Sequence, residues 1–261
     1  MDNVLTAAQA IATARRNRVA LKALAPELAP KDEAAGYRVQ RCLHDLLLPE
    51  RGTPAGYKIG CTSRVMQEYL GIPHPCAGGV FEREIHETGV RLNASDFVRI
   101  GVECEIAVRL ARDLAPSERP FTGESIIEAI DACIPAIEIV DDRYAHWQTL
   151  GAPTLIADDF FAAGCVLGQP VVRTRAPDLA EVKGRAVLNG VEVGHGTGAD
   201  VLGHPAHALA WLANHLAAEG RGLHAGQVVL TGSLVKTEWL KPGAHVVMEL
   251  EGLGSVEARF A

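Results

Sequence analysis

The most regular pattern in the chain is the alternation of apolar and polar positions over residues 102–110. Val, Cys, Ile, Val and Leu occupy the even positions, whereas Glu103 and Glu105 lie at odd positions between them. A period of two is typical of a β-strand, in which successive side chains point to opposite faces. The pattern therefore predicts a strand with one apolar face toward the core and two glutamates on the other face.

Two segments near the N-terminus have the composition and spacing of helices. Residues 5–18 are rich in alanine and contain few helix breakers, and residues 31–48 carry apolar side chains at roughly helical spacing. Pro49 and Gly52 are expected to end the second helix. Further helices are predicted over residues 125–133 and from Pro205 to a stop at Gly220.

After Gly56 the chain changes to short apolar runs separated by glycine and proline. Such runs are typical of strands, and we expect strands within residues 135–140, 161–172, 227–231, 245–250 and 256–260. Strands and helices do not alternate regularly, which argues against a doubly wound parallel sheet. The sequence predicts an α+β fold with a mixed β core and peripheral helices. We divide it into an N-terminal helical segment, residues 1–52, and a β domain, residues 53–261.

Composition and charge narrow the classes of function. Hydrophobic residues make up 48% and charged residues 22% of the 261 residues, as in ordinary globular enzymes. A net charge of −7 offers no basic surface for a phosphate backbone, so nucleic acid is not an expected partner. No apolar run approaches the roughly 20 residues that cross a bilayer, so no membrane is expected either.

Cysteine usage and the first residues bear on location. The 6 cysteines form no C-x-x-C pair, which favours free thiols in a reducing compartment. The chain starts Met1, Asp2, Asn3 without the apolar stretch of a signal peptide. We therefore expect a cytoplasmic protein.

Three glutamates are candidate ligands of a metal ion. Glu103 and Glu105 point to the same face of their strand, about 7 Å apart at the backbone, and Glu138 lies inside an apolar run. A buried carboxylate needs a cationic partner or a proton. Three carboxylates without Cys or His favour Mg²⁺ or Mn²⁺ over zinc. Two alternatives stay open: a solvated strand face for the pair, and a buried ion pair with Arg143 for Glu138.

Lys58 is the candidate cationic group of the site. It lies in the segment Gly-Tyr-Lys-Ile-Gly, between apolar residues and glycines. A half-buried lysine can bind a substrate carboxylate, or carry a proton if its pKa falls. The alternative is a lysine at a strand end whose ammonium group reaches the solvent.

Five segments, in order, resemble the fumarylacetoacetate hydrolase superfamily, in its branch of 2-keto-4-pentenoate hydratases and 4-oxalocrotonate decarboxylases. They are GYKIGCTSRVMQ (56–67), GVECEIAVRL (101–110), PAIEIVDDR (135–143), LIAD with the later GCVLG (155–168), and VLTGS…KPG…ELEGLGSVEARF (229–260). The resemblance covers nearly the whole chain. Each segment alone is a weak motif, but the ordered set is specific.

The resemblance implies a β-roll core of the fumarylacetoacetate hydrolase type, with an N-terminal helical segment beside the active site, and a homo-oligomer. It places the metal ligands on Glu103, Glu105 and Glu138 and the active-site lysine on Lys58. The implied substrate is a small 2-oxo acid that binds Mg²⁺ or Mn²⁺ through its carboxylate and 2-oxo oxygens. The cation would stabilise the enolate that forms on proton transfer or on loss of CO₂. The expected enzyme is a metal-dependent hydro-lyase of aromatic-compound catabolism.

Two segments depart from the hydratase pattern. Hydratases of this type usually carry P-D-[YF]-G where this chain has Pro-Cys-Ala-Gly at 75–78, and A-D-N-A-S-S-G-G where it has Ala-Asp-Asp-Phe-Phe-Ala-Ala-Gly at 157–164. Both segments are expected to line the substrate side of the pocket. The candidate substrate contacts are Cys76, Asp159, Phe160, Phe161, Thr231 and Ser233.

These departures leave the reaction open. The metal half of the site suits a hydratase and a 2-oxo acid decarboxylase, of the 4-oxalocrotonate or oxaloacetate type, equally well, and an acylpyruvate hydrolase is a further alternative. Thiol chemistry at Cys76 and a non-enzymatic role are less favoured, since Lys58 and the glutamates are all present. Phe160 and Phe161 either shape a dry pocket for an apolar substrate tail or pack into the core.

Overall fold

The computed structural model describes residues 3–117 and 119–261, so Met1 and Asp2 of the N-terminal segment lie outside the described part. Its helices are α1 (Asn3–Asn17), α2 (Glu33–Arg51), α3 (Arg64–Leu70), α4 (Gly123–Ile127), α5 (Ala152–Ala157) and α6 (Pro205–Ala218). Its strands are β1 (Pro54–Gly60), β2 (Cys76–Phe81), β3 (Ile85–Glu87), β4 (Val90–Leu92), β5 (Ile100–Leu110), β6 (Ile130–Asp141), β7 (Ala162–Leu167), β8 (Val171–Val172), β9 (Lys183–Leu188), β10 (Val191–Thr197), β11 (Val228–Ser233), β12 (Glu238–Trp239), β13 (Ala244–Leu250) and β14 (Gly254–Phe260).

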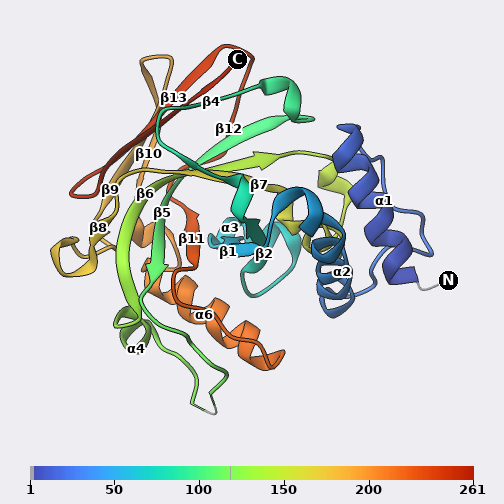
Figure 1. The fold of residues 1–261 in the computed structure, drawn as a ribbon, viewed down its shortest axis with the longest axis horizontal. Coiled ribbons are helices and arrows are strands. Elements are labelled where there is room, and N and C mark those ends of the chain that lie inside the picture. Colours follow the sequence, from blue (N-terminus) through green and yellow to red (C-terminus); the bar gives the residue numbers. More distant parts are fainter. Residues whose placement is uncertain (1–2, 118) are drawn as a thin grey trace.

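Two mixed β-sheets form the centre of the molecule, and the helices lie around them (Figure 1). The larger sheet has the order β2-β1-β11-β5-β6-β7-β3, with β12 on β5 and β8 on β6. The smaller sheet has the order β10-β9-β13-β14-β4. A mixed β core with peripheral helices is what the sequence predicts.

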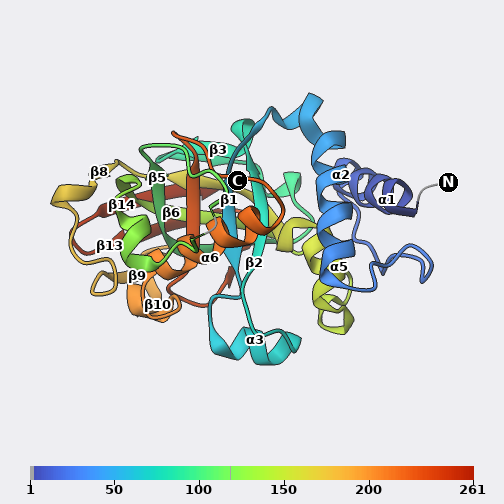
Figure 2. The same cartoon turned by 90° about the horizontal axis from the view of Figure 1, so that it is seen from below.

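The helices α1, α2 and α5 lie together at one end of the molecule (Figure 2). The Asp32 side chain caps α2 by accepting a bond from the Ala35 amide at 2.7 Å. The helix ends at Gly52, as predicted. Gly52 has a φ of 78°, which glycine adopts readily and other residues rarely adopt. The prediction that Pro49 also ends it is wrong, because Pro49 lies within the last turn. The division of the chain at residue 52 stays a prediction.

Residues 125–133 form the second disagreement with the sequence prediction. The helix α4 begins with a capping box at Thr122 but ends at Ile127, and β6 begins at Ile130. Strand β6 pairs with β5 from Ile100 opposite Asp141 to Leu110 opposite Ile130. This long ladder outweighs the helical spacing of the isoleucines, because tertiary pairing overrides local propensity.

The two faces of β5 contribute to two different cores. The even-numbered side chains face the smaller sheet, and Cys104 Sγ lies 3.3 Å from the position of a Cβ on Gly184 of β9. The odd-numbered face looks into the curve of the larger sheet, where Ala107 packs with Ala136 and Leu230 in a smaller apolar cluster. Glu103 and Glu105 share this inner face, since side chains two apart on a strand point the same way.

Strand β1 brings Lys58 to the same sheet. It runs parallel to β11, with Lys58 beside Leu230, and antiparallel to β2, with Lys58 beside Gly78. A Cβ on Gly56 would lie 1.9 Å from the Val228 carbonyl oxygen, so the approach of β1 to β11 requires glycine at this position.

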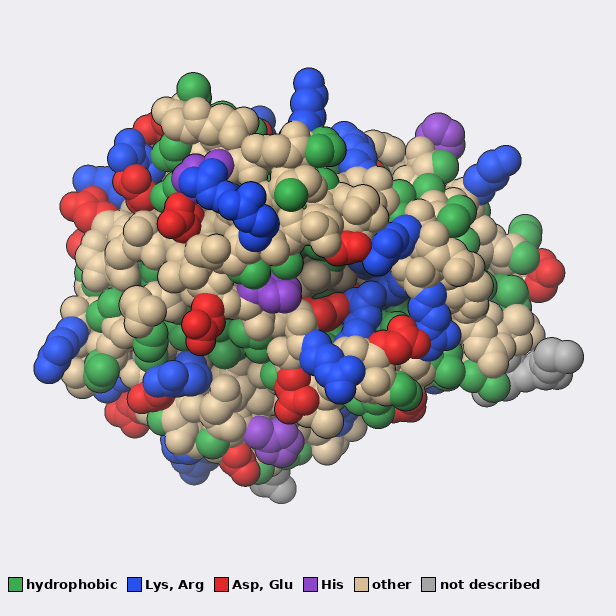
Figure 3. Space-filling model, turned by 45° about the horizontal axis from the view of Figure 1, so that its top comes forward, with side chains coloured by type: hydrophobic (Ala, Val, Ile, Leu, Met, Phe, Trp, Pro, Cys, Tyr) green, Lys and Arg blue, Asp and Glu red, His purple; other side chains and the backbone are tan. Residues whose placement is uncertain are grey.

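On the face shown in Figure 3, acidic and basic side chains are mixed, and this face is hollowed near its centre. No helix among the described residues is both long enough and apolar enough to cross a membrane.

Candidate active site

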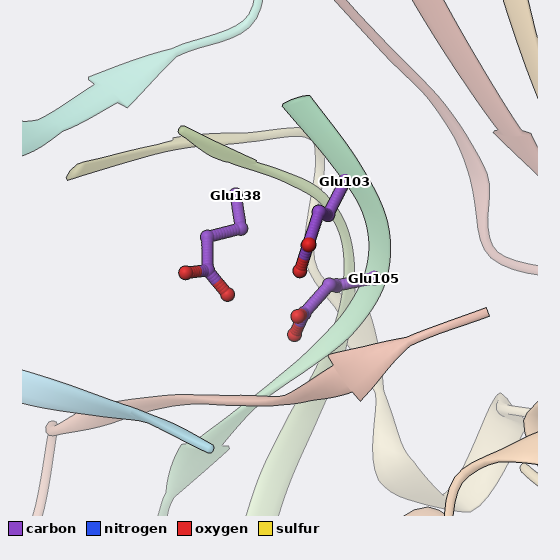
Figure 4. Close-up of side chains that lie close together, drawn as sticks. All are labelled: Glu103, Glu105 and Glu138. Carbon is purple, nitrogen blue, oxygen red and sulfur yellow. The ribbon is translucent and has the colours of Figure 1, made fainter. Parts of the chain in front are cut away.

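Three glutamates converge on the inner face of the larger sheet. Glu103 and Glu105 extend from β5, and Glu138 extends from the neighbouring strand β6, where it lies directly opposite Glu103 in the ladder. Figure 4 shows the three side chains pointing toward one another. One oxygen from each lies within 4.8 Å of the others. Glu105 and Glu138 are buried and Glu103 is partly buried, so the alternative of a solvated strand face is wrong.

The carboxylate oxygens fit a divalent cation. Oε1 of Glu105 and Oε2 of Glu138 are buried without a hydrogen-bond partner among the described residues, although a buried carboxylate oxygen is costly to leave unpaired. When all three glutamates are ionised, the single positive charge of Lys58 leaves two negative charges uncompensated. An all-oxygen ligand set of this charge suits Mg²⁺ or Mn²⁺.

Neighbouring groups orient two of the carboxylates. The Gly232 amide donates a hydrogen bond to Glu105 Oε2 at 2.9 Å, and the Thr237 hydroxyl donates one to Glu103 Oε1. Gly232 has a φ of 127°, and a Cβ there would lie 2.4 Å from Thr62 Oγ1, so only glycine fits. These contacts leave the remaining carboxylate oxygens turned toward one another.

The Lys58 side chain points toward the three glutamates. Its Nζ lies 2.8 Å from Glu138 Oε1, and its side chain is only 4% exposed. Lys58 is therefore the cationic partner of Glu138, and the alternatives of a solvent-reaching lysine and of an Arg143–Glu138 pair are both wrong. Arg143 instead contacts Asp158, with Nε 3.0 Å from Oδ2.

The pKa values reflect this crowding of charge in a buried site. Burial and the charge of Glu138 raise the pKa of Glu103 to about 7. Burial, Glu138 and Glu103 hold the pKa of Glu105 well above its usual range. Burial alone would lower the pKa of Lys58, but the attraction of Glu138, Glu103 and Glu105 raises it above its usual value. Lys58 is thus an ammonium group in this environment.

Two of the residues that depart from the hydratase pattern, Phe160 and Cys76, lie on the Lys58 side of β1. A Cβ on Gly60 would lie 3.4 Å from Lys58 Nζ and 3.5 Å from Phe160 Cδ1, and Lys58 Nζ is 5.9 Å from the Phe160 ring centroid. Cys76 lies opposite Gly60 in the β1–β2 ladder, so its side chain shares the Lys58 face. The Phe160 ring is buried and borders the site at the same time, so the two alternatives for its role are not exclusive.

The Cys76 thiol is an unsuitable nucleophile. The Cys61 thiol and burial both raise the pKa of Cys76 above its usual value. A thiol that stays protonated reacts poorly, since the thiolate is the reactive species. The geometry therefore gives no support to thiol chemistry at this position.

The other candidate substrate contacts use their polar groups elsewhere. Thr231 donates to the Ile106 carbonyl at 2.7 Å, and Ser233 donates to the Val235 carbonyl at 2.6 Å. Asp159 turns its carboxylate away, toward Arg15, His44 and the Gly79 amide. Their role as substrate contacts stays a prediction, and the hydroxyl hydrogens of Thr231 and Ser233 are already used within the protein.

The groups that orient the site were not predicted from the sequence. Thr237 and Gly232 are distant from the glutamates along the chain, and although Gly232 lies in the VLTGS segment, no local pattern indicates that either residue contacts a glutamate. Arg15 and His44 lie in the N-terminal helices but reach Asp158 and Asp159. Only the pairing of strands and the packing of helices bring these groups together.

Comparison with known proteins agrees with this geometry. The chain is 34% identical to a 2-keto-4-pentenoate hydratase of Burkholderia vietnamiensis over 229 residues, covering 88% of this chain and 86% of the relative. It is 34% identical to a 2-hydroxyhexa-2,4-dienoate hydratase of Comamonas testosteroni, covering 90% and 88%. The structure of the 4-oxalocrotonate decarboxylase of Pseudomonas putida G7, complexed with magnesium and adipate, superposes with a TM-score of 0.92 at 28% identity, covering 99% of this chain and 97% of that one.

The chain belongs to the fumarylacetoacetate hydrolase family, whose C-terminal model matches residues 84–261. Within it the chain lies in the branch of 2-keto-4-pentenoate hydratases and 4-oxalocrotonate decarboxylases, which confirms the assignment made from its segments. Lys58 precedes the matched region, so the site combines residues from both parts of the chain.

Stability of the metal-free protein should depend on pH through Glu103. Its pKa is about 7 in the folded chain against an ordinary 4.5, so the folded state binds this proton more tightly than the unfolded state. The stabilisation is complete below 4.5 and is lost as the pH rises through about 7. The Glu103→Gln variant lacks this group. With a chelator present to remove metal, the melting temperature of wild type minus that of Glu103→Gln should therefore fall as the pH rises from about 4.5 to above 7. A constant difference would contradict the assigned environment of Glu103.

Proposed function

We propose that this chain is a divalent-metal-dependent hydratase that acts on a small 2-oxo acid in its 2-hydroxy-dienoic form. The observation that carries the proposal is the group of three carboxylates with unpaired buried oxygens beside the buried ammonium group of Lys58. Relatives named as hydratases, at 34% identity, support the same reaction type. The proposal includes a homo-oligomer in the cytoplasm and a role in the catabolism of aromatic compounds.

Glu103, Glu105 and Glu138 would hold the cation, for which we propose Mg²⁺ or Mn²⁺. When bound, such a cation polarises a carbonyl oxygen and stabilises negative charge that develops on it. The chain supplies the orientation, since the Gly232 amide and the Thr237 hydroxyl fix two carboxylates before any ligand arrives. The related decarboxylase complexed with magnesium supports a divalent metal as the cofactor.

Lys58 would bind the substrate carboxylate and donate or return a proton. Its ammonium group is retained at neutral pH because the neighbouring carboxylates raise its pKa, so it acts first as a charge partner and a donor. The Phe160 ring beside it excludes water from one side of the ammonium group. A charge that is kept from water attracts an anionic substrate more strongly than an exposed one.

A 2-oxo acid decarboxylase is the second candidate. Cys76 and Phe161 stand where a hydratase of this type has an acid and a hydroxyl group, so the strong hydrogen-bonding groups that could hold a water molecule for addition are missing at both positions. The close superposition on 4-oxalocrotonate decarboxylase is a second observation in its favour. An acylpyruvate hydrolase remains an alternative from elsewhere in the family.

A substrate screen separates these reactions. Purified protein with Mg²⁺ or Mn²⁺ would be assayed against 2-hydroxy-2,4-dienoates, 4-oxalocrotonate, acylpyruvates and oxaloacetate. Loss of the dienol absorbance with uptake of water, seen by mass spectrometry of the product, supports the hydratase. Release of CO₂ from 4-oxalocrotonate or oxaloacetate supports the decarboxylase instead. Absence of turnover on all four classes would exclude the proposal.

Substitution Glu105→Gln should abolish metal-dependent activity and leave the fold intact. Glutamine has nearly the same shape but removes one of the negative charges that attract the cation. Calorimetry with Mn²⁺ should show about tenfold or greater loss of affinity. The control is Glu251→Gln, an exposed glutamate beside Lys183 that should bind as wild type does. Equal affinity in Glu105→Gln and wild type would rule out this ligand.

Substitution Lys58→Met should lower kcat/KM by about two or more orders of magnitude, the usual scale for loss of an acid–base or charge partner. Methionine keeps the length of the side chain without its charge, and metal affinity should rise or stay unchanged because a competing cation is gone. Lys183→Met, at an exposed lysine, is the control. A Lys58→Met enzyme within threefold of wild type would show that the lysine is structural.

Activity on the shortest substrate, 2-hydroxypenta-2,4-dienoate, should be poor. Phe160 occupies space beside Lys58 and contacts the Phe161 ring, and neither ring can hydrogen-bond a water molecule. The double substitution Phe161→Ser with Cys76→Asp should raise this activity, whereas longer or more apolar dienoates should be better substrates of wild type. The hypothesis fails if wild type turns over the short substrate with kcat/KM of about 10⁴ M⁻¹s⁻¹ or more.

A further inference from the structure

The segment over Lys58 has an unusual backbone. Asp159, Phe160 and Phe161 have φ values of 55°, 50° and 69°, in the left-handed region that residues other than glycine rarely adopt. The segment packs closely on β2, where a Cβ on Gly78 would lie 2.6 Å from the Asp159 carbonyl oxygen. Three such residues in succession hold this conformation only if contacts from outside the segment impose it.

Two arginines supply part of that restraint by binding Asp158. Arg15 of α1 donates from Nε to Asp158 Oδ1 at 2.6 Å, and Arg143 donates from Nε to Oδ2 at 3.0 Å. Arg143 also donates to the Asp158 carbonyl at 3.0 Å. The side chains of Arg15 and Asp158 are only 2% and 1% exposed, so the pair is shielded from solvent. Both carboxylate oxygens of Asp158, the residue that precedes the left-handed turn, are thus hydrogen-bonded to arginines.

Arg15 also holds the next residue, inside the turn itself. It donates to Asp159 Oδ2 at 3.0 Å, while the other oxygen lies 2.6 Å from His44 Nε2 and accepts from the Gly79 amide at 2.9 Å. Burial would raise the pKa of Asp159, but His44 and Arg15 hold it below its usual range, so the carboxylate is ionised. One side chain of α1 therefore binds two successive carboxylates next to Phe160.

We propose that Arg15 is a positioning residue of the active site, which fixes the turn at 159–161 and thereby holds the Phe160 ring over Lys58. The inference rests on the proposed function, because it assigns Arg15 a part in catalysis by Lys58. It also makes α1 a component of the site, although α1 lies outside the matched region 84–261. Without the guanidinium group, the turn relaxes, the ring moves away and water reaches the ammonium group.

The first test compares neighbouring arginines of the same helix. Arg15→Met should lower kcat by about tenfold or more, since small displacements near reacting groups are costly. Metal affinity should stay unchanged, because the glutamates lie on β5 and β6. Arg16→Met is the matched control: Arg16 pairs with Glu50 at 2.6 Å but is 43% exposed, and its loss should leave kcat unchanged. Arg15→Lys, which keeps the charge, should restore part of the rate.

A double-mutant cycle tests whether Arg15 acts through Phe160. Phe160→Ala should itself lower kcat. If Arg15 only positions the ring, adding Arg15→Met to Phe160→Ala should have little further effect, because coupled residues are not additive. A merely structural arginine would instead lower the melting temperature and leave the kcat of the folded enzyme unaltered. Full additivity of the two effects, or an unchanged kcat in folded Arg15→Met, would overturn the proposal.

A fluorescence measurement keeps this test independent of the reaction. The Trp147 ring lies 5.8 Å from the Phe161 ring in an edge-to-face contact. In a Trp211→Phe, Trp239→Phe background Trp147 is the remaining tryptophan of the 3 in the chain. Arg15→Met should make the Trp147 fluorescence easier to quench with acrylamide, and Arg16→Met should not.

The outcomes separate this inference from the proposed function. If wild type turns over no 2-oxo acid, the proposed function fails, whereas equal quenching in both variants contradicts the positioning role of Arg15. Should Arg15→Met not fold, Asp159→Asn takes its place: it removes the ion pair of Arg15 with Asp159 and leaves the pair with Asp158, and kcat and quenching should change in the same direction.

Discussion

The antiparallel pairing of β5 with β6 is the constraint on which the rest of the site depends. It sets Glu103 opposite Glu138 and leaves Glu105 on the same inner face. The backbone alone therefore brings the three carboxylates together. A shift of the register by one residue would turn these side chains to the other face of the sheet. The apolar alternate positions of both strands prevent such a shift, because they must stay in the core between the sheets. The charge cluster and the hydrophobic core are therefore specified by the same ladder.

The left-handed turn at 159–161 shows how the chain compensates for local strain. Each non-glycine residue in this region costs on the order of 1 kcal/mol or more. The compensation comes from buried, charge-assisted hydrogen bonds to Asp158 and Asp159, which are stronger than neutral ones. Removal of one partner would leave a buried charge unpaired, which costs several kcal/mol. The strain at the site is thus balanced by Arg15 of α1, His44 of α2 and Arg143 after β6, and these contacts join the N-terminal helices to the rest of the protein.

The sequence predicted most elements of the fold and the chemistry of the site, for identifiable reasons. Period-two alternation revealed β5 and the shared face of Glu103 and Glu105, since that pattern is local. The opposite placement of Glu138 depends on strand register, which only the family resemblance suggested. The helix predicted over 125–133 failed because Ile130 has its partner on β5, which the local spacing does not show. Arg15 and His44 left no signal either, because their partners lie 143 and 115 residues away in the chain.

The ion pair between Lys58 and Glu138 bears on how the enzyme is assembled in the cell. Before a metal is bound, three acidic groups lie close together in a buried site. An ammonium group attached to the chain itself, 2.8 Å from one of them, is present from the start at high effective concentration. The polypeptide can therefore reach its native shape first and acquire its cation afterwards, unlike small zinc domains that remain unfolded without metal. The metal-free protein would then be folded but inactive, and binding of a divalent ion would complete the site without refolding the chain.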